Sequence, residues 1–192
     1  MNRRILIAAA VLMASAAPAF AHLNPDEHGS FAAGFSHPLF GLDHILAMVA
    51  VGLWAAQIGG RALWLVPSAF VAMMAAGFSL ATAGIHFPFV EPAILASVVA
   101  LGLLVAMAVR LDAAASAAVV GLFALFHGHA HGGELGSAGA LPFAIGFMLA
   151  TAALHAAGIG LGVALGRLSG GGTLARILGG LTALAGTALI FG

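Results

Sequence analysis

Nine consecutive residues, Phe126 to Glu134, contain three histidines and a carboxylate in a chain that is otherwise poor in charge. His127, His131 and Glu134 follow an i, i+4, i+7 spacing, so on a helix they share one face and His129 points away from it. Imidazole nitrogens and a carboxylate, without a sulfur donor, suit Ni²⁺, Co²⁺, Zn²⁺ or Mn²⁺. The stretch therefore predicts part of a metal site.

A second cluster of the same kind runs from His37 to His44 and reads His-Pro-Leu-Phe-Gly-Leu-Asp-His. His37 and His44 are seven residues apart and would share a face of a continuous helix, and Asp43 lies about 100° round the helix from His44. These residues offer the same donor types as the first cluster. Two such clusters suggest one shared site, provided that the fold brings them together.

The composition indicates the kind of fold that has to bring the two clusters together. Hydrophobic residues make up 62% of the 192-residue chain and charged residues only 6%, whereas soluble domains have about 25% charged residues. The chain is therefore predicted to be an all-α integral membrane protein. It has no cysteine, which excludes disulfides, thiolate metal sites and haem attached through cysteine. Its net charge is zero and it has no basic run, so we expect no nucleic-acid partner.

The first residues resemble a secretory signal peptide, with a basic start at Arg3 and Arg4, an apolar core, and Ala19-Phe20-Ala21 as the cleavage site. We expect a cleaved signal over residues 1–21 and a short periplasmic leader over residues 22–36; an uncleaved first helix is the alternative. The new N-terminus at His22 could bind metal through its amine and imidazole, or the leader could simply be solvated.

Six apolar stretches follow in residues 37–192, and each is close to the ~20 residues that cross ~30 Å of hydrocarbon. We expect the six transmembrane helices of a permease domain at Leu39–Ile58, Ala62–Gly84, Pro92–Val109, Ala113–His131, Pro142–Gly166 and Leu174–Phe191. With the mature N-terminus in the periplasm, every arginine after the signal falls on the cytoplasmic side, as the positive-inside rule requires. This orientation predicts a multi-pass protein of a bacterial inner membrane.

The predicted topology brings the two clusters together. The first span runs inward and the fourth runs outward, so the start of one and the end of the other lie at the same outer depth. An unpaired carboxylate at the bilayer centre costs about 2.5–3.5 kcal/mol, so ionisable residues in spans indicate function; the alternative is a set of purely structural Asp–His hydrogen bonds. We predict a metal site made by six residues: His37, Asp43, His44, His127, His131 and Glu134.

Each of the other notable residues in the spans has two possible roles. His129 is expected outside the site or as an extra donor. His155, in the inner half of the fifth span, is either a relay for the ion or a proton, or a core histidine hydrogen bonded to a neighbouring helix. Gly158, Gly162 and Gly166 form a ridge that permits close helix packing, or that leaves room for a narrow conduction path.

The two motifs resemble those of the HupE/UreJ family of nickel/cobalt permeases. The resemblance covers essentially the whole chain and rests on His37-Pro38-x-x-Gly41-x-Asp43-His44, on Phe126-His127-Gly128-x-Ala130-His131-Gly132-x-Glu134, and on Val51-Gly52-Leu53-Trp54-Ala55. It implies secondary uptake of Ni²⁺, sometimes Co²⁺, in bacteria that load nickel into hydrogenase or urease. It also implies that the six residues named above handle the ion, as transported substrate and not as a prosthetic group.

Three other functions stay open on the sequence alone. A bound Zn²⁺ that activates water would make the chain an intramembrane hydrolase, although no H-E-x-x-H motif is present. A metal sensor or accessory scaffold is a further class, and efflux would use the same ligands as uptake. The absence of a P-loop argues against ATP-driven transport. The sequence leaves open a homo-oligomer, the coupling ion and the client enzyme.

Overall fold

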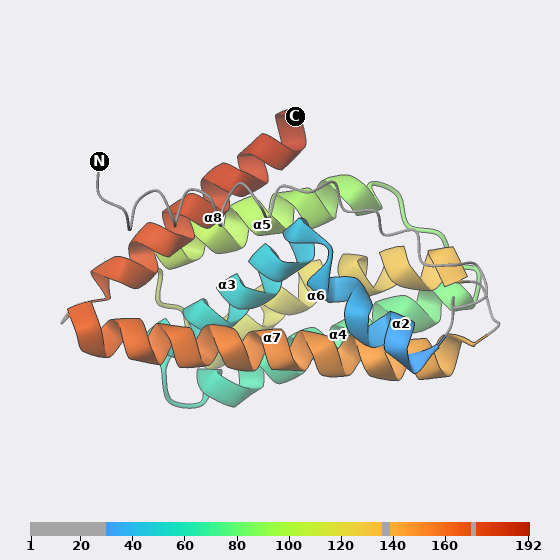
Figure 1. Ribbon diagram of the computed structural model, residues 1–192, viewed down its shortest axis with the longest axis horizontal. Helices are drawn as coiled ribbons and strands as arrows, with labels where there is room; N and C mark the ends of the chain where they lie inside the picture. The colour runs from blue at the N-terminus through green and yellow to red at the C-terminus, as the bar shows by residue number, and fades with distance from the viewer. Residues whose placement is uncertain (1–29, 136–138, 170–171) are drawn as a thin grey trace, which may run out of the picture.

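The computed structural model describes residues 30–135, 139–169 and 172–192, without the side chains of Glu134 and Ser169. The expected signal peptide and His22 lie outside these residues. The described chain contains helices and no strand, which confirms the all-α class (Figure 1). The elements are α2 (Phe31–Ser36), a 3-10 turn η2 (His37–Leu39), α3 (Leu42–Ile58), α4 (Ala62–Thr82), α5 (Val90–Ala106), α6 (Ala113–Leu135), α7 (Ala140–Ser169) and α8 (Thr173–Phe191).

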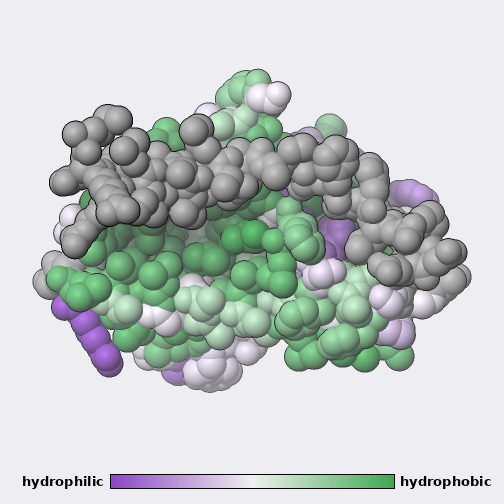
Figure 2. All heavy atoms as spheres, in the orientation of Figure 1, coloured by the Kyte–Doolittle hydropathy of each residue, from purple (hydrophilic) through white to green (hydrophobic). Residues whose placement is uncertain are grey.

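The lengths of the helices confirm only part of the predicted membrane topology. Four helices, α4, α6, α7 and α8, are long and apolar enough to cross a membrane, and α2 with α3 makes a fifth if this bent pair is one span. Helix α5 is apolar but has 17 residues, which corresponds to about 26 Å at 1.5 Å per residue. Six complete spans are therefore not confirmed. Hydrophobic side chains dominate the part of this face that is coloured by hydropathy in Figure 2, as contact with lipid requires.

The start of the first span differs from the prediction of one continuous helix from Leu39. The chain turns by 79° between the segment Phe31–Leu39 and α3. Pro38 sits in the 3-10 turn, and Gly41 is extended at the N-cap of α3 (φ −84°, ψ 113°). Proline lacks the N–H that a continuing helix needs, so the helix breaks here. His37 therefore does not share a helical stripe with His44.

Residues 31–36, the last of the expected leader, form the short helix α2. The Ser30 hydroxyl caps this helix by accepting a hydrogen bond of 2.9 Å from the Ala33 N–H. Ala33 and Gly34 are buried, and α2 packs along α7. This packing holds the 3-10 turn, and with it His37, against the bundle.

Reciprocal glycines allow the closest helix pairs to approach at the backbone. In each of four pairs, a Cβ on a glycine of one helix would collide with backbone of the other, and the reverse also holds. These glycine pairs are Gly34 with Gly146 (α2 and α7), Gly52 with Gly158 (α3 and α7), Gly77 with Gly128 (α4 and α6), and Gly102 with Gly179 (α5 and α8). Small residues at helix interfaces replace the hydrophobic drive that lipid cannot supply. The predicted packing role is confirmed for Gly158 and Gly162, whereas Gly166 faces open space.

At the end of the bundle away from the clusters, side chains bind carbonyls in the last turn of α5 and in the segment that follows it. The last carbonyls of a helix have no partner within the helix. Trp54 Nε1 donates to the Val109 carbonyl (2.8 Å), Gln57 Nε2 to that of Val105 (3.0 Å), and Arg176 Nε to that of Ala106 (2.9 Å). Helices α3, α5 and α8 are joined at this end. Asp112 then starts α6 by accepting hydrogen bonds of 2.9 Å from two backbone N–H groups.

Candidate metal site

Three imidazoles from two helices meet at the opposite end. His44 is in the first turn of α3, and His127 and His131 lie one turn apart near the end of α6. Their side chains are buried. His44 Nε2 lies 2.7 Å from His131 Nε2 and 3.4 Å from His127 Nδ1. The predicted meeting of the two motifs is therefore observed for these residues.

His37, which lies in the 3-10 turn at the bend before α3, also packs against these rings. Its ring centroid lies 4.4 Å from that of His131 and 6.4 Å from that of His44. Phe147 of α7 covers the same rings, at 4.6 Å from His131 and 6.2 Å from His37. We call His37, His44, His127 and His131 the imidazole cluster.

Asp43 reaches the cluster through His44. Its Oδ1 lies 3.2 Å from His44 Nδ1, and its side chain is partly exposed. An Nδ1–H that donates to this carboxylate leaves the lone pair of the neutral His44 ring on Nε2, the atom that faces His127 and His131. This is the arrangement in which a carboxylate orients a metal-binding histidine.

Ser97 of α5 orients His127 in a similar way, and it was not among the predicted site residues. The buried hydroxyl donates to the Ile94 carbonyl (2.6 Å) and lies 2.9 Å from His127 Nε2. With its proton used, the hydroxyl accepts from an Nε2–H, which leaves the His127 lone pair on Nδ1. Its one sequence signal is a serine in an otherwise apolar stretch.

The cluster is closed in this conformation. No group of three or more His, Asp or Glu side chains among residues the structure describes is arranged to hold a metal ion as it stands. Instead, His131 Nε2 is hydrogen bonded to His44 Nε2. With the His44 proton on Nδ1 toward Asp43, His131 Nε2–H is the donor in this bond, so its proton has to move before His131 Nε2 can bind an ion. Two nitrogens on one ion, each at about 2.0–2.1 Å, lie about 3–3.4 Å apart. Opening the 2.7 Å contact to that distance takes less than 1 Å.

The other predicted residues lie outside the cluster or are not fully described. Glu134 belongs to the last turn of α6, but its side chain is not described. His129 lies on another side of α6, where Nε2 donates to the Ile85 carbonyl (2.7 Å) and the ring stacks on Phe87 at 4.4 Å. His129 therefore holds the α4–α5 loop against α6.

His155 of α7 is buried, and neither of its ring nitrogens has a hydrogen-bond partner. The alternative of a core histidine bonded to a neighbouring helix is therefore wrong for this residue.

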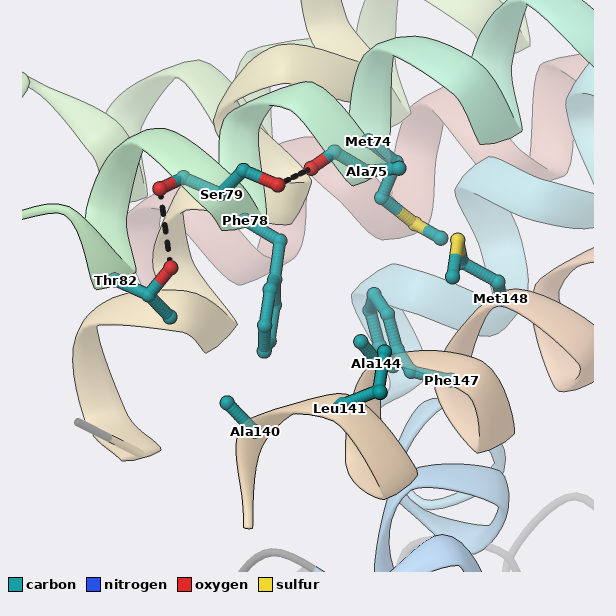
Figure 3. Close-up of a pocket in the computed structure, with 10 residues that line it drawn as sticks. All are labelled: Met74, Ala75, Phe78, Ser79, Thr82, Ala140, Leu141, Ala144, Phe147 and Met148. Carbon is teal, nitrogen blue, oxygen red and sulfur yellow. Dashed lines mark hydrogen bonds between the residues drawn. The ribbon is translucent and has the colours of Figure 1, made fainter. Parts of the chain in front are cut away.

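A pocket of about 260 Å³ opens beside the cluster between α4 and α7 (Figure 3). Phe78 and Phe147 project into it from the two helices, and Met74 and Met148 point toward each other deeper in. Its lining is mainly apolar, with Ser79 and Thr82 at one side. Phe147 therefore forms a wall shared by this pocket and the imidazole cluster.

Comparison with known proteins gives a consistent result. The model of the HupE / UreJ protein family matches residues 10–189. Protein HupE of Rhizobium leguminosarum bv. viciae is 50% identical over 183 residues, which cover 94% of this chain and 95% of that protein. No solved structure matches. The chain therefore belongs to the HupE/UreJ family, a family of nickel/cobalt transporters.

Proposed function

We propose that this protein is a secondary transporter that imports Ni²⁺, with Co²⁺ as a second substrate, across a bacterial inner membrane. One observation carries the proposal: the ring nitrogens of His44, His127 and His131 converge within 2.7–3.4 Å in a buried layer at one end of the helices. A transporter needs such a layer where the ion exchanges water for protein donors. Family membership makes nickel or cobalt the substrate to test first.

In this mechanism the imidazole cluster receives the ion at the periplasmic side. The ion replaces the His131–His44 hydrogen bond, while Asp43 holds His44 with its Nε2 toward the ion and contributes negative charge. We include Glu134 as a further carboxylate at this entrance, on the grounds of its place in the last turn of α6. Release to the other side follows a rearrangement of the helices of the alternating-access kind.

The proposed direction of transport, into the cell, rests on the positions of the arginines and on the membrane potential. The four arginines Arg61, Arg110, Arg167 and Arg176 lie in or beside loops at the end away from the cluster, which fits a cytoplasmic side there. A membrane potential that is negative inside favours entry by about 2.3 kcal/mol per charge per 100 mV, or about 4.6 kcal/mol for a divalent ion. We propose that the imported nickel supplies the maturation of hydrogenase or urease.

The test is uptake of radioactive nickel by cells that lack other nickel importers. Asp43→Asn and Glu134→Gln are each expected to lower uptake at least tenfold. The matched control is Asp112→Asn, which removes a carboxylate at the opposite end and keeps an N-cap residue. Expression and membrane insertion of every variant are measured in parallel. Normal uptake by both cluster-side variants would refute the proposed site.

Exchange of metal in the purified protein separates this function from that of an intramembrane zinc hydrolase. Transported ions exchange readily with free metal, whereas a catalytic zinc stays bound during dialysis. Retention of one zinc per chain after extended dialysis would count against transport.

A further inference from the structure

Among the buried histidines of the described segments, His155 is the one whose two ring nitrogens both lack a hydrogen-bond partner, and its side chain is only 1% exposed. A buried polar group without a partner costs about 1–3 kcal/mol. Such groups are rare in folded proteins, and each needs an explanation. A group that binds something for part of a working cycle is one such explanation.

The residue lies on the face of α7 that continues inward from the imidazole cluster. Phe143, Phe147, Thr151 and His155 follow at four-residue intervals and are all buried. Phe147 contacts the rings of the cluster, and His155 is eight residues further along, about 12 Å at 1.5 Å per residue. The face therefore leads from the cluster to His155.

Helix α4 also links the imidazole cluster to His155. The Phe70 ring of α4 lies 5.7 Å from the His127 ring and 5.0 Å from the His155 ring, measured between centroids. The Phe70 ring therefore contacts both His127, the innermost imidazole of the cluster, and His155. The two histidines lie on different helices, α6 and α7, and both face the interior beside α4.

Two further donors lie one turn closer to the cluster. The Thr151 hydroxyl is buried and donates to the Met74 sulfur over 3.7 Å, which is a weak interaction that a better acceptor or an ion would replace. An imidazole, a hydroxyl and a thioether form a much poorer donor set than four imidazoles with a carboxylate. An ion that moves to such a set is held less tightly, which is what the step before release requires.

We propose that His155 is a second, inner station for the transported metal ion, with the Thr151 hydroxyl, the Met74 thioether and water completing the coordination. This inference rests on the proposed transport function and adds to it a position that the ion occupies after it leaves the imidazole cluster. The competing explanation is packing alone, because the His155 ring meets the Phe70 ring edge-on, at 80°.

The absence of cysteine from the chain allows a direct test. His155→Cys places a single thiol at the proposed station, and a Co²⁺ ion that reaches it produces a thiolate-to-cobalt charge-transfer band in the near ultraviolet. The matched control is Ala153→Cys, two residues away on the exposed side of α7. Both full-length proteins are titrated with Co²⁺ in lipid nanodiscs, and cobalt bound by imidazole is followed by its visible absorption.

We expect the charge-transfer band in His155→Cys, up to one Co²⁺ per chain, and no band in Ala153→Cys. Imidazole-bound cobalt without a thiolate band in His155→Cys would overturn the inner station and leave the proposed function standing. Equal bands in both variants would overturn it as well, because the thiol would then be reporting adventitious metal. Absence of any cobalt binding, in the parent protein also, would overturn the proposed function itself.

A transport measurement decides the matter independently. His155→Leu removes an unpaired polar group, so packing alone predicts unchanged or higher thermal stability and normal uptake. The inner station predicts that nickel uptake falls at least tenfold, while Co²⁺ affinity at the cluster stays within threefold of the parent value. Normal uptake by His155→Leu, next to a loss in Asp43→Asn, would refute the station whatever the cysteine variant shows.

Discussion

The Nε2 atoms of His44 and His131, which are 87 positions apart in the sequence, lie 2.7 Å from each other in the buried layer between α3 and α6. His44 also contacts His127, and its Nδ1 faces the Asp43 carboxylate, so it connects His127, His131 and Asp43.

Loss of His44 should weaken metal binding more than loss of any group that only orients a ligand. Removal of an orienting group typically costs 10–100-fold in affinity, and we expect His44→Ala to lower Co²⁺ affinity by more than about 100-fold. Titration of the purified protein in nanodiscs measures this. His86→Ala, which changes an exposed loop histidine, is the control and should bind Co²⁺ as the parent does.

Ser97→Ala should weaken metal binding although serine itself holds no ion. Without the hydroxyl, nothing fixes the proton of His127 on Nε2, and we expect a loss in Co²⁺ affinity of about 10–100-fold. Ser116→Ala is a matched control, because Ser116 is also buried and also donates to a carbonyl of its own helical turn, that of Asp112. Equal affinities of the two variants would show that Ser97 has no orienting role.

His129→Ala separates the structural histidine from the cluster. The variant loses a hydrogen bond to Ile85 and the stacking on Phe87, so we expect it to be less stable by about 1 kcal/mol. Nickel uptake should stay within about threefold of the parent once corrected for protein amount. A tenfold loss of uptake at normal abundance would place His129 among the residues that handle the ion.

External pH should control uptake through the imidazoles. A metal ion binds the neutral ring, and an ordinary imidazole has a pKa of about 6.5, so protonation competes with the ion as pH falls. We expect uptake into proteoliposomes to fall at least about tenfold from pH 8 to pH 5. The membrane potential is clamped with a potassium gradient and an ionophore, so that only the protonation of the protein changes. A flat profile would contradict a site built from histidines.

Adjacent glycines of α8 test the packing. A Cβ on Gly179 would lie 2.6–2.8 Å from atoms of α5, whereas one on Gly180 would meet nothing within 4 Å. Gly179→Ala should therefore destabilise the protein by about 1–3 kcal/mol, as overpacking does. Gly180→Ala should be neutral or stabilising by up to about 1 kcal/mol, because alanine is the better helix former. Thermal unfolding in detergent compares the two directly.

Sequence reasoning succeeded where helix direction alone decides the outcome. The first and fourth predicted spans run in opposite directions, so the start of one and the end of the other have to bring His44 to the level of His127 and His131. It failed where the local backbone departs from a straight helix: the periodicity that placed His37 on one stripe with His44 could not foresee the 79° turn at Pro38 and Gly41.

It also could not find partners that depend on how neighbouring helices are rotated. The contact of Ser97 with His127 requires a particular face of α5 toward α6, and no spacing along the chain encodes that. The same holds for His155, whose lack of a partner depends on what α4 presents to it.

The reciprocal glycines have a consequence for how such a protein can move. Helices whose backbones are this close lose contact when they separate and collide when they roll against one another, so we expect α3 with α7, and α4 with α6, to move as pairs. His44 and His155 lie on the first pair, and His127, His131 and Phe70 lie on the second. A relative shift of the two helix pairs by less than 1 Å at the cluster would open the His44–His131 contact and move Phe70 against His155 at the same time. In the proposed transport cycle, the binding of the ion at the cluster and its movement toward His155 would then be coupled.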